Sequence, residues 1–377
     1  MIEKGKISAF QMAVLMYPTI FSTAILLLPR ITGKQAAQDL WLSPIWASAA
    51  GFLSVLLVYR LHRLYPGQTF IQQCETILGP VLGKLLGFAY LFYFVHITAI
   101  ILREYGEFVV GTFLRLTPIL IIIALMVFVC MAAVRGGIEV LGRTAELFGP
   151  LVTLLLVIIF LLLLPELHPE YVLPFMEHGV GPSLKGAVAP MIWFSEFWLV
   201  SFFFPYLADP ERGLRWSVIS VLIVMVSMVI TNIIALMMFG HLMQHLTYPV
   251  MAAAGYITVG GFIEHLESIV MAVWVAGTFL KVSTFYYAFS LATAQWLKLN
   301  DYRPVVLPLG FLLILVAFWV TPNLIQMSYS MATTLPFYFL FYQLFVPAVL
   351  LLVAQFRRRS HRRRNPGRPQ PNALTDG

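Results

Sequence analysis

Residues 145–164 read AELFGPLVTLLLVIIFLLLL, a run in which Glu146 is the single charged side chain. At 1.5 Å per residue, a helix of about 20 residues crosses roughly 30 Å, the thickness of the hydrocarbon core of a bilayer. The strict alternation of apolar and polar residues that marks a half-buried strand is absent from this run. The stretch therefore predicts a membrane-spanning helix.

Comparable runs recur along the whole chain. Of its 377 residues, 60% are hydrophobic and 11% are charged, and the mean hydropathy is +0.86. A globular core of this size cannot hide so much apolar surface, which excludes a soluble enzyme, and the missing alternation excludes an outer-membrane barrel. We predict an all-α polytopic membrane protein with ten transmembrane helices, near 7–28, 43–62, 81–102, 114–134, 145–164, 184–207, 215–240, 266–295, 304–321 and 333–355.

The distribution of basic residues predicts the orientation of these spans. Lys and Arg fall mainly on one set of alternate loops, and this set shares a side with both termini, so we expect both termini to be cytoplasmic. The formal charge is +7, but residues 357–377 alone carry seven arginines. Such a cluster favours attraction to anionic lipid over a nucleic-acid site. We expect a transmembrane domain over 1–356 and a basic, disordered tail over 357–377.

The first span contains a proline at its centre, within the sequence YPTIFSTA at 17–24. Pro18 lacks an amide hydrogen and clashes with the preceding turn, and hydroxyls nearby can satisfy the freed carbonyls. The pattern predicts local unwinding at mid-membrane depth. An ordinary proline kink with Ser and Thr used in packing is the alternative.

Two charged residues lie deep inside predicted spans. Glu196 is near the middle of 184–207, and Lys281 is about fifteen residues into 266–295. Charges at this depth are costly unless paired or hydrated, which makes both residues candidates for a functional site, with an ion pair between them as the simplest arrangement. The alternatives are a structural hydrogen bond for Glu196 and a side chain extended to the membrane surface for Lys281.

No arrangement of residues indicates catalysis, so we expect neither an enzyme nor a cofactor. Cys74 and Cys130 are the only cysteines and do not form a metal motif. His241 and His245 have metal-ligand spacing, but no third ligand is evident, and we expect no metal. Tyr93, with aromatic neighbours at helical spacing, is expected to line a cavity, although such stripes also occur in ordinary packing.

The chain resembles a known family, the B subunits of spore germinant receptors, within the amino acid–polyamine–organocation transporter superfamily. The resemblance extends to about Arg357. It rests on three segments in a fixed order: STAILLLPR at 22–30, FSEF at 194–197 before Pro205, and FIEHLES at 262–268 leading into Val273 and Trp274.

The resemblance implies a LeuT-like fold, with two inverted repeats of five helices and helices 1 and 6 broken at the midplane. A ligand between these helices would contact Thr19, Ser22, Thr23, Ala24, Trp193, Ser195, Glu196 and Phe197, with Tyr93 as a further cavity residue. Helix 8 would supply an ion or charge site at Lys281, Ser283 and Thr284, where the lysine ammonium takes the place of a coupling ion.

The implied function is a membrane subunit of a germinant receptor in the spore inner membrane. Its partners would be a small germinant, expected to be an amino acid, the A and C subunits of the receptor, and the lipid bilayer. A proton- or sodium-coupled amino-acid transporter, using protonation of Glu196, is the alternative function. A scaffold subunit whose pocket no longer binds ligand is a third.

Overall fold

The computed structural model describes residues 2–257 and 266–364, with side chains up to residue 358. This part of the chain is helical and contains no β-strand. Residues 262–265 of the FIEHLES segment lie outside the described residues. The nine longest helices are α1 (Ala9–Ala36), α2 (Ser43–Leu64), α4 (Pro80–Thr112), α5 (Ile119–Gly136), α6 (Ile138–Leu163), α9 (Pro210–Phe239), α11 (Glu267–Trp296), α12 (Arg303–Trp319) and α15 (Val346–Arg364).

Shorter helical pieces connect or interrupt these helices. The short α-helices are α3 (Phe70–Leu78), α7 (Gly181–Ala187), α8 (Pro190–Ser195), α10 (Pro249–Ala254), α13 (Leu324–Thr333) and α14 (Leu335–Leu340). The 3₁₀ segments are η1 (Ala37–Leu42), η2 (Leu164–Glu166), η3 (Pro169–Val172), η4 (Glu196–Phe202), η5 (Phe204–Tyr206) and η6 (Gly240–His245), and η7 (Phe341–Phe345) is a π-helix.

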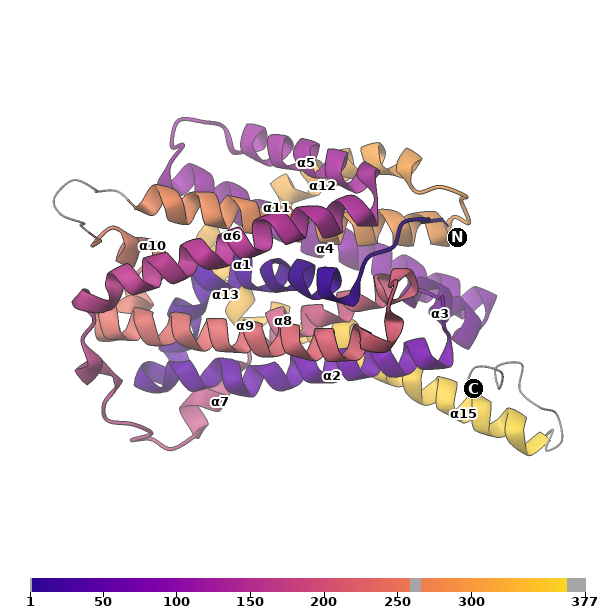
Figure 1. Cartoon of the computed structure of the whole chain (residues 1–377), viewed down its shortest axis with the longest axis horizontal. Coiled ribbons are helices and arrows are strands. Elements are labelled where there is room, and N and C mark those ends of the chain that lie inside the picture. The colour runs from indigo at the N-terminus through magenta and orange to yellow at the C-terminus, as the bar shows by residue number, and fades with distance from the viewer. Residues whose placement is uncertain (1, 258–265, 365–377) are drawn as a thin grey trace.

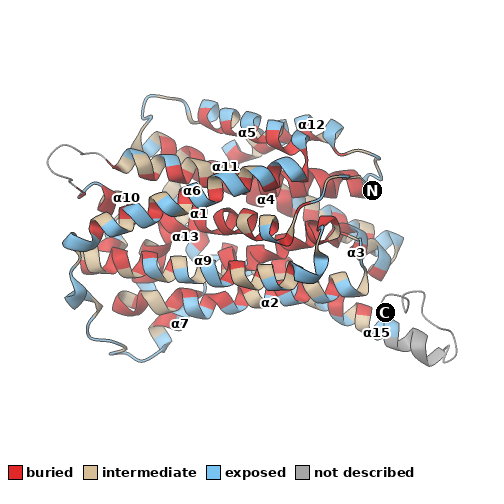
Figure 2. Ribbon diagram, in the orientation of Figure 1, coloured by how far each residue is buried: buried red, intermediate tan, exposed pale blue. Residues whose placement is uncertain are grey.

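Helix α1 forms the centre of the bundle. It packs against α9, α11, α6 and α7, and α9 also packs against α2 (Figure 1). Figure 2 shows buried positions on inward faces and exposed positions on the outward faces of α2, α5 and α9. Many of the exposed side chains are large and apolar, among them Leu85, Phe92, Phe128, Leu154, Val226 and Phe311. An apolar outer surface around a packed interior is what an integral membrane protein presents to lipid.

Helical structure is found in each of the ten predicted ranges, but fewer helices meet a strict test of length and hydropathy. In the described residues seven helical stretches are long and apolar enough to cross a membrane, or eight if α12 and α13, which meet at 94°, form one bent span. The continuous stretch Ala9–Leu64 counts as one of the seven. The count of ten therefore stays a prediction.

The expected unwinding around Pro18 does not occur. α1 is a continuous α-helix from Ala9 to Ala36 with both Pro18 and Pro29 inside it. Because α1 is enclosed by other helices, its backbone groups have few partners outside the helix, which favours the helical conformation. The hydroxyl of Thr19 donates to the carbonyl of Leu15 at 2.7 Å, a bond within the same turn.

The tail also differs from expectation at its start. α15 continues to Arg364 and includes the first part of the arginine cluster. α15 therefore extends past residue 356, the predicted end of the membrane domain. Residues 365–377 lie outside the described residues.

The N-terminal segment is bound to the bundle at the end where α15 also finishes (Figure 1). Ile7 forms a parallel bridge with Leu207, which joins the segment to the connection between η5 and α9. The carboxylate of Glu3 accepts hydrogen bonds from the hydroxyls of Tyr287 and Tyr302 and from the backbone of Ile138, at 3.2–3.3 Å. One buried carboxylate thus connects the N-terminal segment to α6 and α11 and to the residue preceding α12.

We predict that Gly83→Ala destabilises the packing of α3 on α4. A Cβ atom at Gly83 would lie 2.4 Å from the Cα of Glu75, and a backbone atom cannot easily move away. The free energy of unfolding should fall by about 1–3 kcal/mol, the usual cost of overpacking. Thermal unfolding of the purified protein in detergent measures this, with Gly111→Ala in the same helix as the control. Gly111 has no atom within 4 Å of the added Cβ, so an equal loss in both variants would contradict the packing argument.

Candidate functional site

A buried ion pair lies at the centre of the bundle. Nζ of Lys281, in the middle of α11, is 2.7 Å from Oε2 and 2.9 Å from Oε1 of Glu196. Both residues are at most 2% exposed. The two charges neutralise each other, which allows both to remain far from water. The pair expected from the two separate segments is therefore present.

The backbone conformation changes at Glu196. α8 ends at Ser195 and the 3₁₀ segment η4 begins at Glu196, so the predicted sixth span consists of short helical pieces. A seven-residue 3₁₀ segment is unusual, and such segments often mark hinges or strained sequences. The hydroxyl of Ser54 in α2 donates to the carbonyl of Ser195 at this junction. The Glu196 carboxylate thus projects from a point where helix geometry is already altered.

Thr23 connects the ion pair to α1. Its Oγ1 accepts a hydrogen bond from Nζ of Lys281 at 3.0 Å and another from Nε1 of Trp193 at 3.1 Å. Gly277 permits this approach, since a Cβ there would lie 2.8 Å from Cβ of Ser22. Side chains from α1, α8, η4 and α11 therefore meet at one point.

A cavity of about 20 Å³ adjoins the pair, which is room for about one water molecule. Its polar lining consists of Thr23, Glu104, Trp193, Glu196 and Lys281, and the rest is apolar. Glu104, from α4, is 1% exposed, and its Oε1 has no hydrogen-bond partner among the described residues. The site therefore combines two carboxylates with one ammonium group.

Two of the predicted residues form a second polar group. Oγ of Ser195 bonds to Oε1 of Gln343, and Nε2 of Gln343 bonds to the hydroxyl of Tyr93. Gln343 lies in the π-helix η7, a form that is rare and frequent at functional sites. Tyr93 also stacks on Tyr342, with ring centroids 4.9 Å apart. Tyr93 thus supports the start of η4 through Gln343 and is absent from the lining of the small cavity.

The remaining predicted site residues do not line the small cavity and lie at several different places in the bundle. Thr19 and Thr284 lie together, with their hydroxyl oxygens 3.2 Å apart. Ser22 lines a different small cavity, between α1, α6 and α11. Ser283 is two residues from Lys281 and therefore on another face of α11. Ala24 and Phe197 are buried but line none of these cavities.

Sequence reasoning missed Glu104 and Gln343. The rule that singled out Glu196 applies equally to Glu104. The predicted span ends at residue 102 and leaves Glu104 in a predicted loop, whereas α4 continues to Thr112 and places Glu104 inside the bundle. Gln343 gave no signal, since one amide in an apolar span is compatible with many roles.

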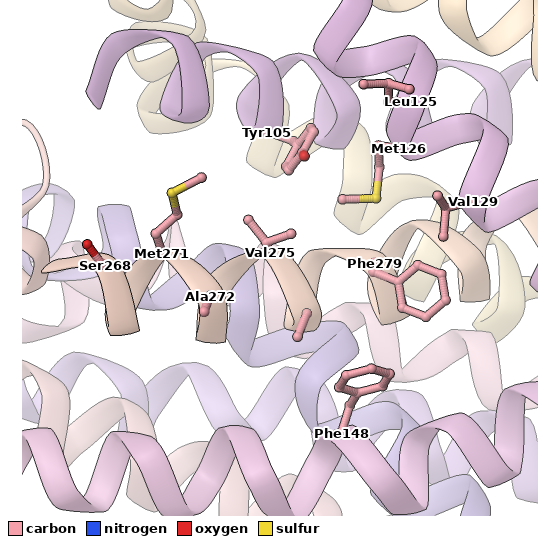
Figure 3. A pocket seen from close by; sticks show the side chains of 11 residues that line it. Tyr105, Leu125, Met126, Val129, Phe148, Ser268, Met271, Ala272, Val275 and Phe279 are labelled. Carbon is pink, nitrogen blue, oxygen red and sulfur yellow. The ribbon is translucent and has the colours of Figure 1, made fainter. Parts of the chain in front are cut away.

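A larger cavity, of about 630 Å³, opens between α4, α5, α6 and α11 (Figure 3). Met271, Val275 and Phe279 line it from α11, and Met126 and Phe148 lie on either side of Phe279. Its lining has no charged side chain. It therefore lacks groups that would orient a charged ligand, and the small cavity remains the candidate site.

Metal ligands do not gather in the described part of the chain, where no group of three or more His, Cys, Asp or Glu residues has the required geometry. His241 and His245 are exposed in η6. Cys74 and Cys130 are buried and free.

Comparison with known proteins places these features in a family. The family described as "Spore germination protein" matches residues 6–325. Spore germination protein KB of Bacillus subtilis is 28% identical over 95% of this chain and 97% of its own length. Spore germination protein YndE of the same organism is 22% identical, over 95% and 99%.

A solved structure of similar fold is that of a Na⁺-coupled sialic acid symporter in its substrate-bound outward-open state. The TM-score is 0.61 at 13% identity, covering 91% of this chain and 80% of the symporter. At this identity the likeness establishes a shared transporter fold and says nothing of substrate.

We predict that Lys281→Met lowers the free energy of unfolding by about 3–5 kcal/mol, because Glu196 is left buried without its counter-charge. The double variant Lys281→Met, Glu196→Met should recover most of that loss, since it removes both charges. Denaturant or thermal unfolding in detergent tests this as a double-mutant cycle.

The control is Arg143→Gln, which breaks a pair with Glu139 whose N···O distance is 3.7 Å. Both partners are largely exposed, so the change should stay within about 0.5 kcal/mol. If Lys281→Met changed the free energy of unfolding as little as this control does, the ion pair would not contribute to stability.

Proposed function

The chain belongs to the spore germination protein family, and we propose that it is the membrane subunit of a germinant receptor that binds a small germinant, an amino acid, at the bilayer midplane. Family membership supports the receptor role, and the transporter fold supports a ligand site between helices at that depth.

The observation that carries this proposal is the buried cluster of Lys281, Glu196 and Thr23. An amino acid carries an ammonium and a carboxylate on neighbouring atoms, so it complements a site that contains both charges. The side chains come from α1, η4 and α11, and a ligand bound among them contacts all three elements at once. The affinity for such a ligand therefore depends on how these three elements are arranged.

The cavity beside the cluster is too small for an amino acid. Binding therefore requires α1, η4 and α11 to move apart, and the ligand favours the opened arrangement because it contacts the site only there. A ligand shifts an equilibrium by its differential affinity for the two arrangements. This is sufficient for a sensor, which needs a change of conformation and no passage of ligand across the bilayer.

For the finer features of the fold we propose ten crossings in a LeuT-like 5+5 arrangement. Two helices of spanning length, α1 and α2, make up the stretch Ala9–Leu64, whose 56 residues are too long for one crossing. The pieces from α7 to η5 form a sixth span broken near Glu196, and α12 forms the ninth. The membrane domain then occupies 1–356, with the tail at 357–377.

We further propose that the protein lies in the spore inner membrane, with both termini cytoplasmic, and assembles with A and C subunits. The arginines from 357 onward suit the anionic cytoplasmic leaflet. Partner subunits are inferred from the germination relatives.

An amino-acid transporter is the second candidate function. The symporter fold supports it, and buried carboxylates such as Glu196 could carry a proton. The two functions differ in whether labelled ligand accumulates behind the membrane. In a scaffold subunit, substitutions of the site residues would change neither germination nor ligand uptake.

We expect Glu196→Ala and Thr23→Ala to abolish or alter ligand-triggered germination, and we expect no accumulation of labelled ligand in either the wild type or the variants. Spores carrying the protein with its cognate subunits are exposed to a panel of amino acids, while release of core contents and uptake of labelled ligand are recorded together. Gly111→Ala serves as a control with no contact to the site. Normal germination together with uptake that depends on Glu196 would make the protein a transporter, and unchanged behaviour of both variants would favour a scaffold.

The proposed orientation predicts opposite labelling at the two ends of the bundle. Lys34→Cys, at the end of α1, should react with a membrane-impermeant maleimide in intact cells, whereas Arg143→Cys in α6 should react only after permeabilisation. Both native side chains are exposed, and the two native cysteines are buried, so background labelling should be low. The reverse pattern would invert the topology.

A further inference from the structure

Glu104 is the one ionisable group lining the small cavity that has no hydrogen bond or ion pair among the described residues. It lies in α4 beside Ile100 and Ile101 and lines the same cavity as Lys281 and Glu196. Glu104 is 1% exposed, and no described residue donates a hydrogen bond to its Oε1. A buried carboxyl without a partner is costly, so its presence calls for a reason.

Lys281 cannot supply the missing partner in this arrangement. An ammonium group has three N–H donors, and those of Lys281 are directed at Oε1 and Oε2 of Glu196 and at Oγ1 of Thr23. The Lys281–Glu196 pair is also neutral as a unit. Glu104 therefore remains as one acidic group beyond the charge that Lys281 can balance.

The neighbouring arginine is not available either. Arg103 forms a salt bridge with Glu107 at 2.8 Å and donates to the carbonyls of Phe318 and Pro322. Its guanidinium is thus held against the connection between α12 and α13. A hydrogen-bond donor for Glu104 must therefore come from outside this set of side chains.

We propose that Glu104 is the group that binds the ammonium of the germinant, and that it selects small primary amines with an apolar substituent. This inference rests on the proposed function and names the ligand class of the same site. A ligand ammonium brings one positive charge and three donors, which is what the cavity lacks. The apolar lining suits a short hydrocarbon side chain: Ile97, Ile100, Ile101, Ile192, Met331 and Phe339.

The chemistry of the site also indicates which ligands are rejected. A 2-hydroxy acid has the same shape as the matching amino acid but carries no positive charge. Its hydroxyl offers Glu104 one hydrogen bond and no counter-charge, and sites built to bond a particular polar group discriminate against analogues that lack it. Sugars, which have many hydroxyls and no charge, fail against the apolar lining as well.

Spores carrying the receptor with wild-type protein, Glu104→Gln or Glu107→Gln provide the test. The probes are L-alanine and L-valine, each paired with its 2-hydroxy acid, and the readout is the concentration that gives half-maximal germination. In the wild type we expect the amino acid to act at a concentration lower than its hydroxy acid by on the order of tenfold or more. In Glu104→Gln this preference should disappear, because the amino acid loses potency while the hydroxy acid does not.

Glu107→Gln is the matched control. Glu107 lies one turn further along α4, is paired with Arg103, and does not line the cavity. The variant should keep the wild-type preference. Should Glu104→Gln fail to accumulate in spore membranes, Glu104→Asp decides the question, since it retains the carboxylate and should show weaker responses with the preference for amines intact.

The two proposals can fail separately. Suppose that wild-type spores respond to amino acids. If Glu104→Gln then keeps the preference for the amine, or if Glu104→Asp loses it, the role of Glu104 is overturned while the receptor function stands. If wild-type spores respond to none of the amines, the amino-acid assignment in the proposed function is overturned, and the role of Glu104 with it.

Discussion

The cost of burying charge at the centre of a membrane protein governs this structure. Lys281 and Glu196 can stay in the interior because their charged atoms are 2.7 Å apart and because Thr23 accepts the third hydrogen of the ammonium. Either charge is tolerated in the interior only while α1, η4 and α11 keep the two residues and Thr23 in contact. The relative placement of α1, η4 and α11 is thus linked to one electrostatic requirement.

The same requirement makes the site responsive. A polar cluster in a close-packed interior has few intermediate arrangements, because a small separation breaks hydrogen bonds that water cannot replace. In the function proposed above, a ligand that brings its own opposite charges would relieve that cost when the elements separate. The backbone changes from α-helix to 3₁₀ geometry at Glu196, and under the function proposed above the resulting change in conformation would be the signal for germination.

The tertiary structure also divides residues that appear equivalent in the sequence. Thr19, Ser22 and Thr23 lie within two turns of α1, yet Thr19 bonds to Thr284, Ser22 packs at Gly277, and Thr23 reaches Lys281. Neighbouring positions on a helix point in different directions, so proximity in sequence does not place residues in one site. Tyr93 is a similar case, since it is connected to the site only through Gln343.

The sequence by itself determined the class of protein, the positions of its helices and the two deep charges, because hydropathy over about 20 residues and the cost of intramembrane charge are local properties. It did not reveal that α1 remains continuous through Pro18, since that depends on the helices that enclose it. It also could not show that Glu104 lies beside the ion pair, because three residues from α4, η4 and α11 share a cavity only after the bundle has formed. Charge can be read from composition, but charge balance is a property of the assembled interior.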